Sequence, residues 1–556
     1  MTAQCRTHHG VGDRRHPSGR SAEKKRPPSR LQQLDDRAAM LRAATCIILT
    51  GALVRLGLAA LLDPGVDEAY AMAVATQWQL SWFDHPPMAF WWVKAMRELA
   101  RPFWGDDVPV VILRLPFVLA FTATSVVMFD LTHHRWGPRA GLWMLLALSL
   151  APFFLVSAGS WMVPDGPLFL FLALTARLLD RILFSACEPA RRRRLWYAAG
   201  LTLGLAGLSK YHAVLFALGA AAFLLATHHR SQLRHSAPWL AVAIAAVTVS
   251  PVLVWNAQHH WVSLLFQSSR GLGSGGPDWA GFARAMLGQL AYLGPWTLIA
   301  SIAALFWSLR TRDSRTGPAA FLAAIGLPAI VVFTAVPLWG GSALPHWQMP
   351  GWLFLLPMLG HALAATSSRR HKRVRLARAF AVTALAGLAF AIVAVTLIRV
   401  VPPSSALIAR LGLGGFLQES ITWRGLADGL SERGLLPATS HSSVPQDRPL
   451  VVAFRWIDAS RLAEVLGPRA TVIVFDSDPR GFAFLADSAA WLGRDVLFVG
   501  RPGSFAGGLE LAQPYVGRID RQAPIPITIG SETLFQVEVA FGRSLISPFP
   551  LPYPRR

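Results

Sequence analysis

Residues 41–62, LRAATCIILTGALVRLGLAALL, form the first of a series of long apolar runs in this chain. A helix needs about 20 predominantly apolar residues to cross a membrane. Of the 556 residues, 53% are hydrophobic and only 15% are charged, whereas a soluble domain carries about 25% charged residues. Composition and apolar blocks together predict a polytopic membrane protein.

We expect about eleven transmembrane helices, because eleven runs have the character of membrane spans. The neighbouring runs 195–209 and 211–227 could also be read as one long helix. The expected spans cover residues 41–62, 108–130, 139–159, 166–185, 195–209, 211–227, 237–256, 285–308, 318–337, 350–366 and 376–398.

The net charge of +22 does not indicate a nucleic-acid partner, because the basic residues lie in short clusters between apolar runs. Those clusters fall on one side of the predicted spans, and the positive-inside rule places that side in the cytoplasm. The acidic loops and the tail then lie outside. The basic set is Arg135 and Arg139, Arg191 to Arg194, Arg230 and Arg234, Arg310, Arg312 and Arg315, and Arg369 to Arg375.

Three regions follow from this pattern. Residues 1–39 are polar and basic without an apolar signal core, so we expect a disordered cytoplasmic arm, with Met40 as an alternative start. Residues 40–400 form the all-α membrane domain. Residues 401–556 change character and predict a small extracytoplasmic α/β domain, with strands at 449–456, 470–475 and 495–499 and a helix at 458–466. Cys5, Cys46 and Cys187 have neither metal nor disulfide spacing.

The first outer loop, residues 63–107, carries the most unusual chemistry. Asp67 and Glu68 are adjacent carboxylates at a membrane surface, although acids at a helix start are also ordinary N-terminal residues. Asp84 is expected to cap a helix that Pro86 and Pro87 open and that continues to about residue 100. With its aromatic face, this helix suits the membrane interface.

Other outer segments add ionisable side chains at the same membrane face. Each also has an ordinary explanation: a helix cap for Asp165, a snorkelling lysine for Lys210, and polar turns in an aromatic belt for the rest. Their convergence on one face favours an enzyme that meets a substrate with a polar head and a lipid tail. The further candidates are Tyr211, Asn256, His259 and His346.

These motifs, in this order, resemble the GT-C class of integral membrane glycosyltransferases, and within it family 39. That group includes protein O-mannosyltransferases, lipid A aminoarabinose transferases and rhizobial galacturonosyltransferases. The resemblance covers about residues 41–366, and the aminoarabinose transferases have lysine where this chain has His85. It is carried by Asp67-Glu68, Phe83-Asp84-His85-Pro86-Pro87, Pro164-Asp165-Gly166-Pro167, Leu208-Ser209-Lys210-Tyr211, Trp255-Asn256-Ala257-Gln258 and Pro345-His346-Trp347.

The resemblance implies transfer of a sugar from a polyprenyl-phosphate donor to an acceptor hydroxyl of an envelope lipid, glycan or protein, with inversion. Asp67 would be the general base, while Lys210 and His85 would face the leaving phosphate. Glu68 and Asp165 would position the sugar or acceptor. Tyr211 would contact the donor, with Asp84, Asn256, His259 and His346 as possible substrate contacts. Because the donor is a lipid phosphate, no nucleotide-binding motif is required, and Glu68, Asp84 and His85 could supply ligands to a divalent metal.

Two other functions remain open on the sequence. A lipid or solute transporter, or flippase, would place its functional polar residues at mid-helix depth and would not need the Asp67 carboxylate. A non-catalytic sensor or assembly protein would act through the tail alone, and its loop carboxylates would be dispensable.

Overall fold

The computed structural model describes residues 30–273, 275–310, 316–365, 421–437, 447–529 and 532–553, together with residues 382, 385 and 389. Residues 30–39, which were expected to belong to a disordered arm, instead begin helix α1 (Arg30–Leu61). Residues 1–29 of that arm and almost all of the expected span 376–398 lie outside the described residues. So does the predicted boundary between the two domains at residue 400.

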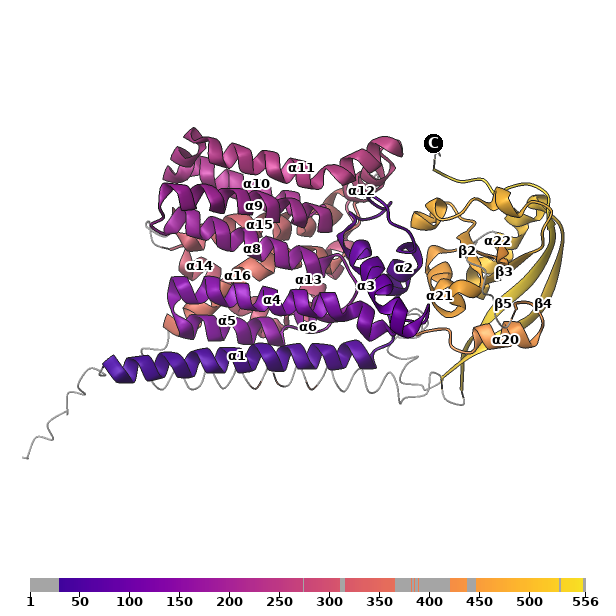
Figure 1. The fold of residues 1–556 in the computed structure, drawn as a ribbon, viewed down its shortest axis with the longest axis horizontal. Coiled ribbons are helices and arrows are strands. Elements are labelled where there is room, and N and C mark those ends of the chain that lie inside the picture. Colours follow the sequence, from indigo (N-terminus) through magenta and orange to yellow (C-terminus); the bar gives the residue numbers. More distant parts are fainter. Residues whose placement is uncertain are drawn as a thin grey trace, which may run out of the picture.

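Helices cover each of the predicted spans up to residue 366 and lie side by side in one bundle (Figure 1). Among the described residues, four helices are long and apolar enough to cross a membrane, or up to seven if each bent pair is one span. These are the helices of a multi-pass membrane protein. The bundle comprises α1 (Arg30–Leu61), α4 (Val110–Trp136), α5 (Pro138–Leu150), α6 (Pro152–Leu155), α7 (Ser157–Ser160), α8 (Asp165–Phe184), α9 (Pro189–Ser209), α10 (Ala213–Ala226), α11 (Ser236–Gln258), α13 (Trp279–Leu293), α14 (Pro295–Ser308), α15 (Pro318–Ala335) and α16 (Met349–Ala365).

Two predicted spans are not single helices. The run 139–159 bends by 81° after Leu150, and the run 285–308 bends by 99° after Leu293. Proline follows each break, at Pro152 and Pro295, and proline cannot donate the backbone hydrogen bond that would continue the helix. In contrast, α9 and α10 are two separate helices, as predicted, with the chain extended at Lys210 between them.

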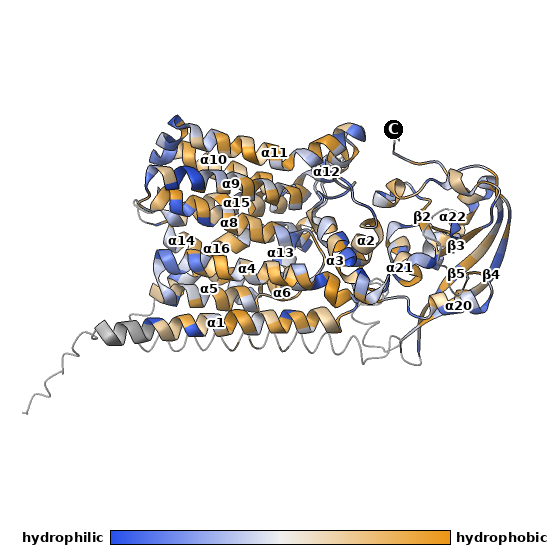
Figure 2. Cartoon of the chain, in the orientation of Figure 1, coloured by the Kyte–Doolittle hydropathy of each residue, from blue (hydrophilic) through white to orange (hydrophobic). Residues whose placement is uncertain are grey.

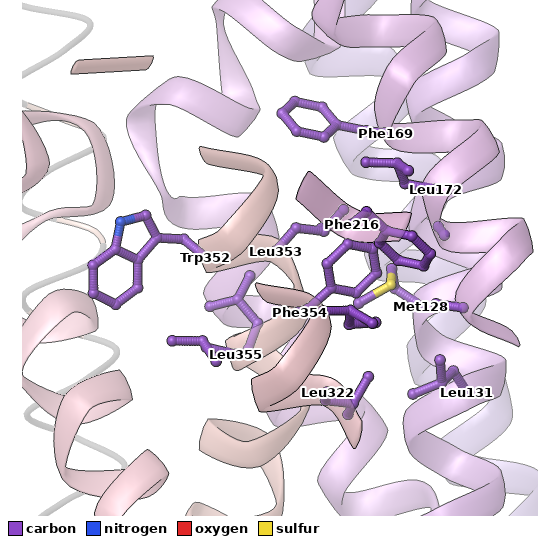
Figure 3. Close-up of a cluster of buried hydrophobic side chains, with 14 of the residues drawn as sticks. Met128, Leu131, Phe169, Leu172, Phe216, Leu322, Trp352, Leu353, Phe354 and Leu355 are labelled. Carbon is purple, nitrogen blue, oxygen red and sulfur yellow. The ribbon is translucent and has the colours of Figure 1, made fainter. Parts of the chain in front are cut away.

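The bundle is apolar inside, and polar residues gather at its ends (Figure 2). Its core includes Met128, Phe216 and Phe354, which come from α4, α10 and α16 and point toward one another (Figure 3). At several positions, including Gly200 and Gly219, the helices approach so closely that only glycine fits. A Cβ on Gly200 would lie 2.2 Å from the carbonyl oxygen of Ala241, and one on Gly219 would lie 2.0 Å from that of Ala324.

At one end of the bundle, short helices lie between the membrane helices and the C-terminal domain (Figure 1). They are α2 (Val66–Val74), α3 (Met88–Trp104), α12 (Val262–Leu272) and the 3₁₀ turn η4 (Pro345–Gln348). The expected helix after Pro86-Pro87 is present as α3. However, Asp84 does not cap it, because the residue before the helix is Pro87 and no side chain bonds to its first turn.

The C-terminal domain contains a five-stranded sheet of order β2-β1-β3-β5-β4. The three predicted strands are confirmed as β1 (Leu450–Ala453), β2 (Thr471–Val474) and β3 (Val496–Gly500), which pair in parallel, and the predicted helix is α21 (Trp456–Leu466). The sequence prediction missed a long antiparallel hairpin, β4 (Val516–Ile529) and β5 (Glu532–Leu545). The prolines of β4, such as Pro526, and its many charged residues concealed the strand pattern. The remaining helices are α20 (Leu426–Glu432) and α22 (Pro502–Ala512), with the 3₁₀ turn η8 (Arg480–Phe484).

The C-terminal domain packs directly on α2. Tyr70 and Val74 share one buried apolar cluster with Leu462 of α21 and Phe482 of η8. The fully buried Arg461 donates a hydrogen bond of 2.8 Å to the carbonyl oxygen of Pro64, just before α2. The position of α2 is therefore fixed by both domains.

Candidate active site

The adjacent carboxylates of α2 have opposite environments. Neighbouring residues of a helix point about 100° apart, so the side chains of Glu68 and Asp67 meet different surroundings. Glu68 is fully buried and accepts two hydrogen bonds from the Arg114 guanidinium, of 2.8 and 2.6 Å. The backbone N–H groups of Gly65 and Met162 also donate to it, at 2.9 and 3.0 Å. The Glu68 oxygens are thus engaged in holding α2 against α4.

Asp67, in contrast, is solvent-exposed, and within the described residues its carboxylate has neither a hydrogen bond nor an ion pair. Desolvation by the surrounding protein nevertheless raises the pKa of Asp67, which Arg480 opposes and Asp84 and Glu68 reinforce. An exposed carboxylate without a described partner is free to accept a proton from a molecule that reaches it.

The Phe83-Asp84-His85 segment is fixed against α2 and the C-terminal domain. The Tyr70 hydroxyl donates to Asp84 at 2.9 Å and accepts a hydrogen bond of 3.0 Å from the backbone N–H of Gly481. Burial raises the pKa of Asp84, which Arg480 and the Tyr70 hydrogen bond oppose. Phe83 stacks on both Tyr553 and Phe484, with ring centroids 4.5 and 5.9 Å away.

Asp165 and Lys210 form one buried ion pair. Asp165 opens α8, and Lys210 lies in the extended break between α9 and α10, so both side chains emerge at helix ends. The Lys210 ammonium donates to both carboxylate oxygens, at 3.0 and 2.9 Å. The structure thus brings together two residues that the sequence offered separately, and most of the lysine's charge is matched within the protein.

His85 and His346 approach the same ion pair as neutral rings. Burial, and then Lys210, lowers the pKa of each to about 3. The Nδ1 atom of His85 is buried and, within the described part of the chain, has no hydrogen-bond partner. At neutral pH neither ring can supply a positive charge, so His85 can only donate or accept a hydrogen bond.

Three other predicted residues make local contacts. The Tyr211 hydroxyl lies 2.8 Å from the Ser263 hydroxyl, which joins the α9–α10 break to α12. Asn256 closes the turn between α11 and α12, since its side chain donates to Val252 and accepts from Leu264. The His259 ring stacks on Trp255 at 4.1 Å. Asn256 therefore shapes the region of the site from outside its charged cluster.

Sequence reasoning missed two arginines that face the cluster. Arg270 of α12 and Arg480 of η8 both act electrostatically on Asp84 and His85. Burial lowers the pKa of Arg270, and the neighbouring charge of Arg480 lowers it further. A signal was available for Arg270, because arginine is uncommon in loops that the positive-inside rule places outside.

The described residues do not provide a metal site. Within the described ranges, no group of three or more His, Cys, Asp or Glu side chains is arranged to hold a metal ion. Glu68, one of the three suggested ligands, is instead paired with Arg114. The Glu68, Asp84 and His85 set does not fit a metal, and we route no chemical step through one.

Comparison with known proteins supports a transferase. The model of the dolichyl-phosphate-mannose-protein mannosyltransferase family matches residues 84–255. The lipid A galacturonosyltransferase RgtD of Rhizobium johnstonii is 28% identical over 284 residues, which are 48% of this chain and 54% of RgtD. The predicted resemblance to the GT-C glycosyltransferases is confirmed. The chain spans about half the length of this curated relative.

Solved structures show the same GT-C fold. The crystal structure of ArnT from Cupriavidus metallidurans in the apo state matches with a TM-score of 0.59 and 18% identity, over 90% of this chain and 98% of ArnT. ArnT bound to undecaprenyl phosphate matches with a TM-score of 0.58 and 19% identity, over 90% and 97%. These matches show the shared fold, while the family-model match and the similarity to RgtD favour a glycosyltransferase over the transporter alternative.

Proposed function

We propose that this protein transfers a sugar from a polyprenyl-phosphate donor to an acceptor hydroxyl, with Asp67 as the general base. The observation that carries the proposal is the contrast within α2. Asp67 is accessible, unpaired among the described residues and of raised pKa, whereas Glu68 is saturated by four hydrogen bonds. A general base needs a free oxygen and a pKa closer to neutrality than that of an ordinary aspartate.

The reaction is a single displacement. Asp67 takes the proton of the acceptor hydroxyl, and the acceptor oxygen forms a bond to the anomeric carbon of the sugar. The bond between that carbon and the phosphate oxygen breaks, so the configuration inverts and the polyprenyl phosphate leaves with the electron pair. Cations stabilise the charge that develops on the leaving phosphate.

Because Lys210 is already in an ion pair, its role differs from that of Asp67. Because Asp165 already binds two of its protons, Lys210 has one N–H left for a substrate oxygen. We propose that Asp165 orients Lys210 and that His85, neutral and with Nδ1 free of a described partner, adds a hydrogen bond to the substrate. Glu68 then serves to position α2 and takes no part in the chemistry.

The donor class rests on two relatives. RgtD is a lipid A galacturonosyltransferase, and ArnT has been solved with undecaprenyl phosphate. We propose that this chain likewise uses a lipid-phosphate donor and an envelope acceptor. The active site would lie at the outer face of the bacterial cytoplasmic membrane, since the basic clusters lie at the opposite ends of the helices.

The test is a paired genetic and biochemical experiment. Mass spectrometry of envelope glycolipids and glycoproteins from a deletion strain should show one sugar missing, which identifies the acceptor. The purified protein should then transfer that sugar from its polyprenyl-phosphate carrier. An unchanged envelope in the deletion strain, together with no transfer by the purified protein, would contradict the proposal.

A further inference from the structure

The C-terminal domain reaches into the site through the 3₁₀ turn η8. Its first residue, Arg480, has a φ of 49°, in the left-handed region that side chains other than glycine seldom adopt. The next residue, Gly481, donates its N–H to the Tyr70 hydroxyl at 3.0 Å, which fixes the turn against α2. Unfavourable backbone conformations persist where the surrounding structure enforces them, and they cluster at functional sites.

The guanidinium of Arg480 is held by an aromatic ring rather than by a strong ion pair. It lies 3.9 Å from the centroid of the Trp456 ring. Its Nε is 3.5 Å from Asp478, a distance too long for a good charge-assisted hydrogen bond. Its side chain is 19% exposed. The donors of this arginine are therefore mostly unused by the described residues.

A second guanidinium, that of Arg270, is near enough to Arg480 for their charges to interact. Arg270 and Arg480 approach the same Phe266 ring, with distances of 5.6 and 5.8 Å to its centroid. Arg270 also stacks on Trp347 at 4.8 Å. Two positive charges held close together in a partly desolvated place repel each other. An anion that binds to both removes that repulsion, and the forked guanidinium matches the oxygens of phosphate.

The other basic groups of the site are less able than the two arginines to bind a phosphate. Lys210 is matched by Asp165 through two hydrogen bonds, and His85 is neutral because its pKa is about 3. The charges of Asp67 and Asp84 interact with those of the two arginines, but neither carboxylate forms a described ion pair with them. The positive charge that remains for a substrate therefore comes from α12 and from the C-terminal domain.

We propose that Arg480 of the C-terminal domain and Arg270 of α12 together bind a phosphate group of the substrate, so that the C-terminal domain completes the active site. This inference rests on the proposed function and names the residues that hold one of its substrates. The phosphate belongs either to the polyprenyl carrier or to an acceptor such as lipid A. In both cases the chemistry of recognition is the same.

The experiment measures binding to the purified full-length protein in detergent by titration calorimetry. The probes are undecaprenyl phosphate, lipid A and lipid A without its phosphates. The variants are Arg480→Met, Arg480→Lys and Arg270→Met. Arg543→Met is the matched control, because Arg543 also stacks on an aromatic ring, Phe541, at 4.5 Å, but pairs with Asp495 and Asp520 within the C-terminal domain.

Loss of a charged hydrogen bond should weaken binding of the phosphate-bearing probe about tenfold to a hundredfold in Arg480→Met and Arg270→Met. Arg480→Lys should lose less, because the charge remains and only the fork is lost. Weaker binding of undecaprenyl phosphate assigns the phosphate to the carrier. Weaker binding of lipid A, with no change for the phosphate-free form, assigns it to the acceptor.

Thermal unfolding of each variant shows whether the domain still docks, and Arg480→Lys and Arg270→Met keep the test available if Arg480→Met unfolds. Binding of both phosphate probes that matches wild type and Arg543→Met would overturn the two-arginine site alone. A wild-type protein that bound neither phosphate probe would contradict the proposed function as well.

Discussion

Helix α4 joins two polar clusters that differ in how their charges are matched. Arg114 lies near its first turn and Arg135 near its last, about 30 Å apart at 1.5 Å per residue. At the Arg135 end, Asp180 accepts hydrogen bonds from Arg135 and Arg177, and Asp130 accepts one from Arg177. Every carboxylate named in this cluster therefore has an arginine partner.

At the Arg114 end, some charged groups have a partner among the described residues and others do not. Glu68 and Asp165 are paired with Arg114 and Lys210, while Asp67 has no described partner. Arg270 and Arg480 both approach the Phe266 ring. Polar groups left unpaired cost free energy on folding. The cluster at the Arg114 end contains such groups and is therefore the one suited to bind a substrate. The cluster at the Arg135 end serves to hold helices together.

The largest expected effect comes from changing Asp67, the carboxylate without a described partner. Asp67→Asn keeps the size of the side chain but removes its basic oxygen, so kcat should fall by about 10²–10⁴-fold. The thermal unfolding temperature should stay near that of wild type, because the described residues make no contact with this carboxylate that the change would break. Asp107→Asn, an exposed carboxylate of the same loop, is the control. Wild-type turnover of Asp67→Asn would remove Asp67 as the base.

The neighbouring carboxylate should behave in the opposite way. Glu68→Gln breaks a fully buried ion pair and leaves Arg114 unmatched, which costs about 3–5 kcal/mol of stability. The variant that does fold should retain turnover much closer to wild type than Asp67→Asn does. Chemical denaturation and kcat, measured on the same preparation, check both parts. A stable Glu68→Gln protein with strongly reduced kcat would transfer the chemical role to Glu68.

A smaller effect, on stability alone, is expected at the Arg135 end of α4. Asp180→Asn weakens the hydrogen bonds from Arg135 and Arg177, but Asp130 still pairs with Arg177. We expect a stability loss of about 1–3 kcal/mol, with kcat and KM unchanged. Denaturation curves and steady-state kinetics test this. An altered KM would show that the two ends of α4 are coupled, and the comparison between them would fail.

The smallest expected effect is on how the stability of the protein depends on pH. The folded protein holds the pKa of His85 at about 3, below the ordinary value of 6.5, so the unfolded chain binds more protons between these pH values. The contribution of His85 to stability is complete above about pH 6.5 and is lost as the pH falls toward 3. His85→Gln should make stability depend less steeply on pH in this window. Identical slopes for the two proteins would show that His85 is not held neutral.

Much of the fold could be predicted because its signals are local. Apolar runs predicted the helices, and short runs such as residues 470–475 predicted the strands. The bends after Leu150 and Leu293 were not predicted, although a proline follows each break. The orientation of the helices in the membrane and the roles of the site residues stay predictions.

The site was harder to predict because its contacts are distant in sequence. Asp67 and Glu68 stand out in the sequence, but nothing local says that Glu68 meets Arg114, 46 residues away. Nor does the spacing of Lys210 and Asp165 show that they form one pair. Arg480 lies in a different domain, and its neighbours in the sequence give no sign that it faces α2.

The hydrogen bond between Tyr70 and Gly481 has a consequence for biosynthesis. The two residues are 411 positions apart in the chain, and ribosomes add about 5–20 residues per second. Roughly 20–80 s therefore pass between synthesis of the two partners. During that interval the Phe83-Asp84-His85 segment lacks the contact that secures it, while the helices that surround it are already being made. The segment is secured only after Gly481 has been made and the C-terminal domain has folded onto α2.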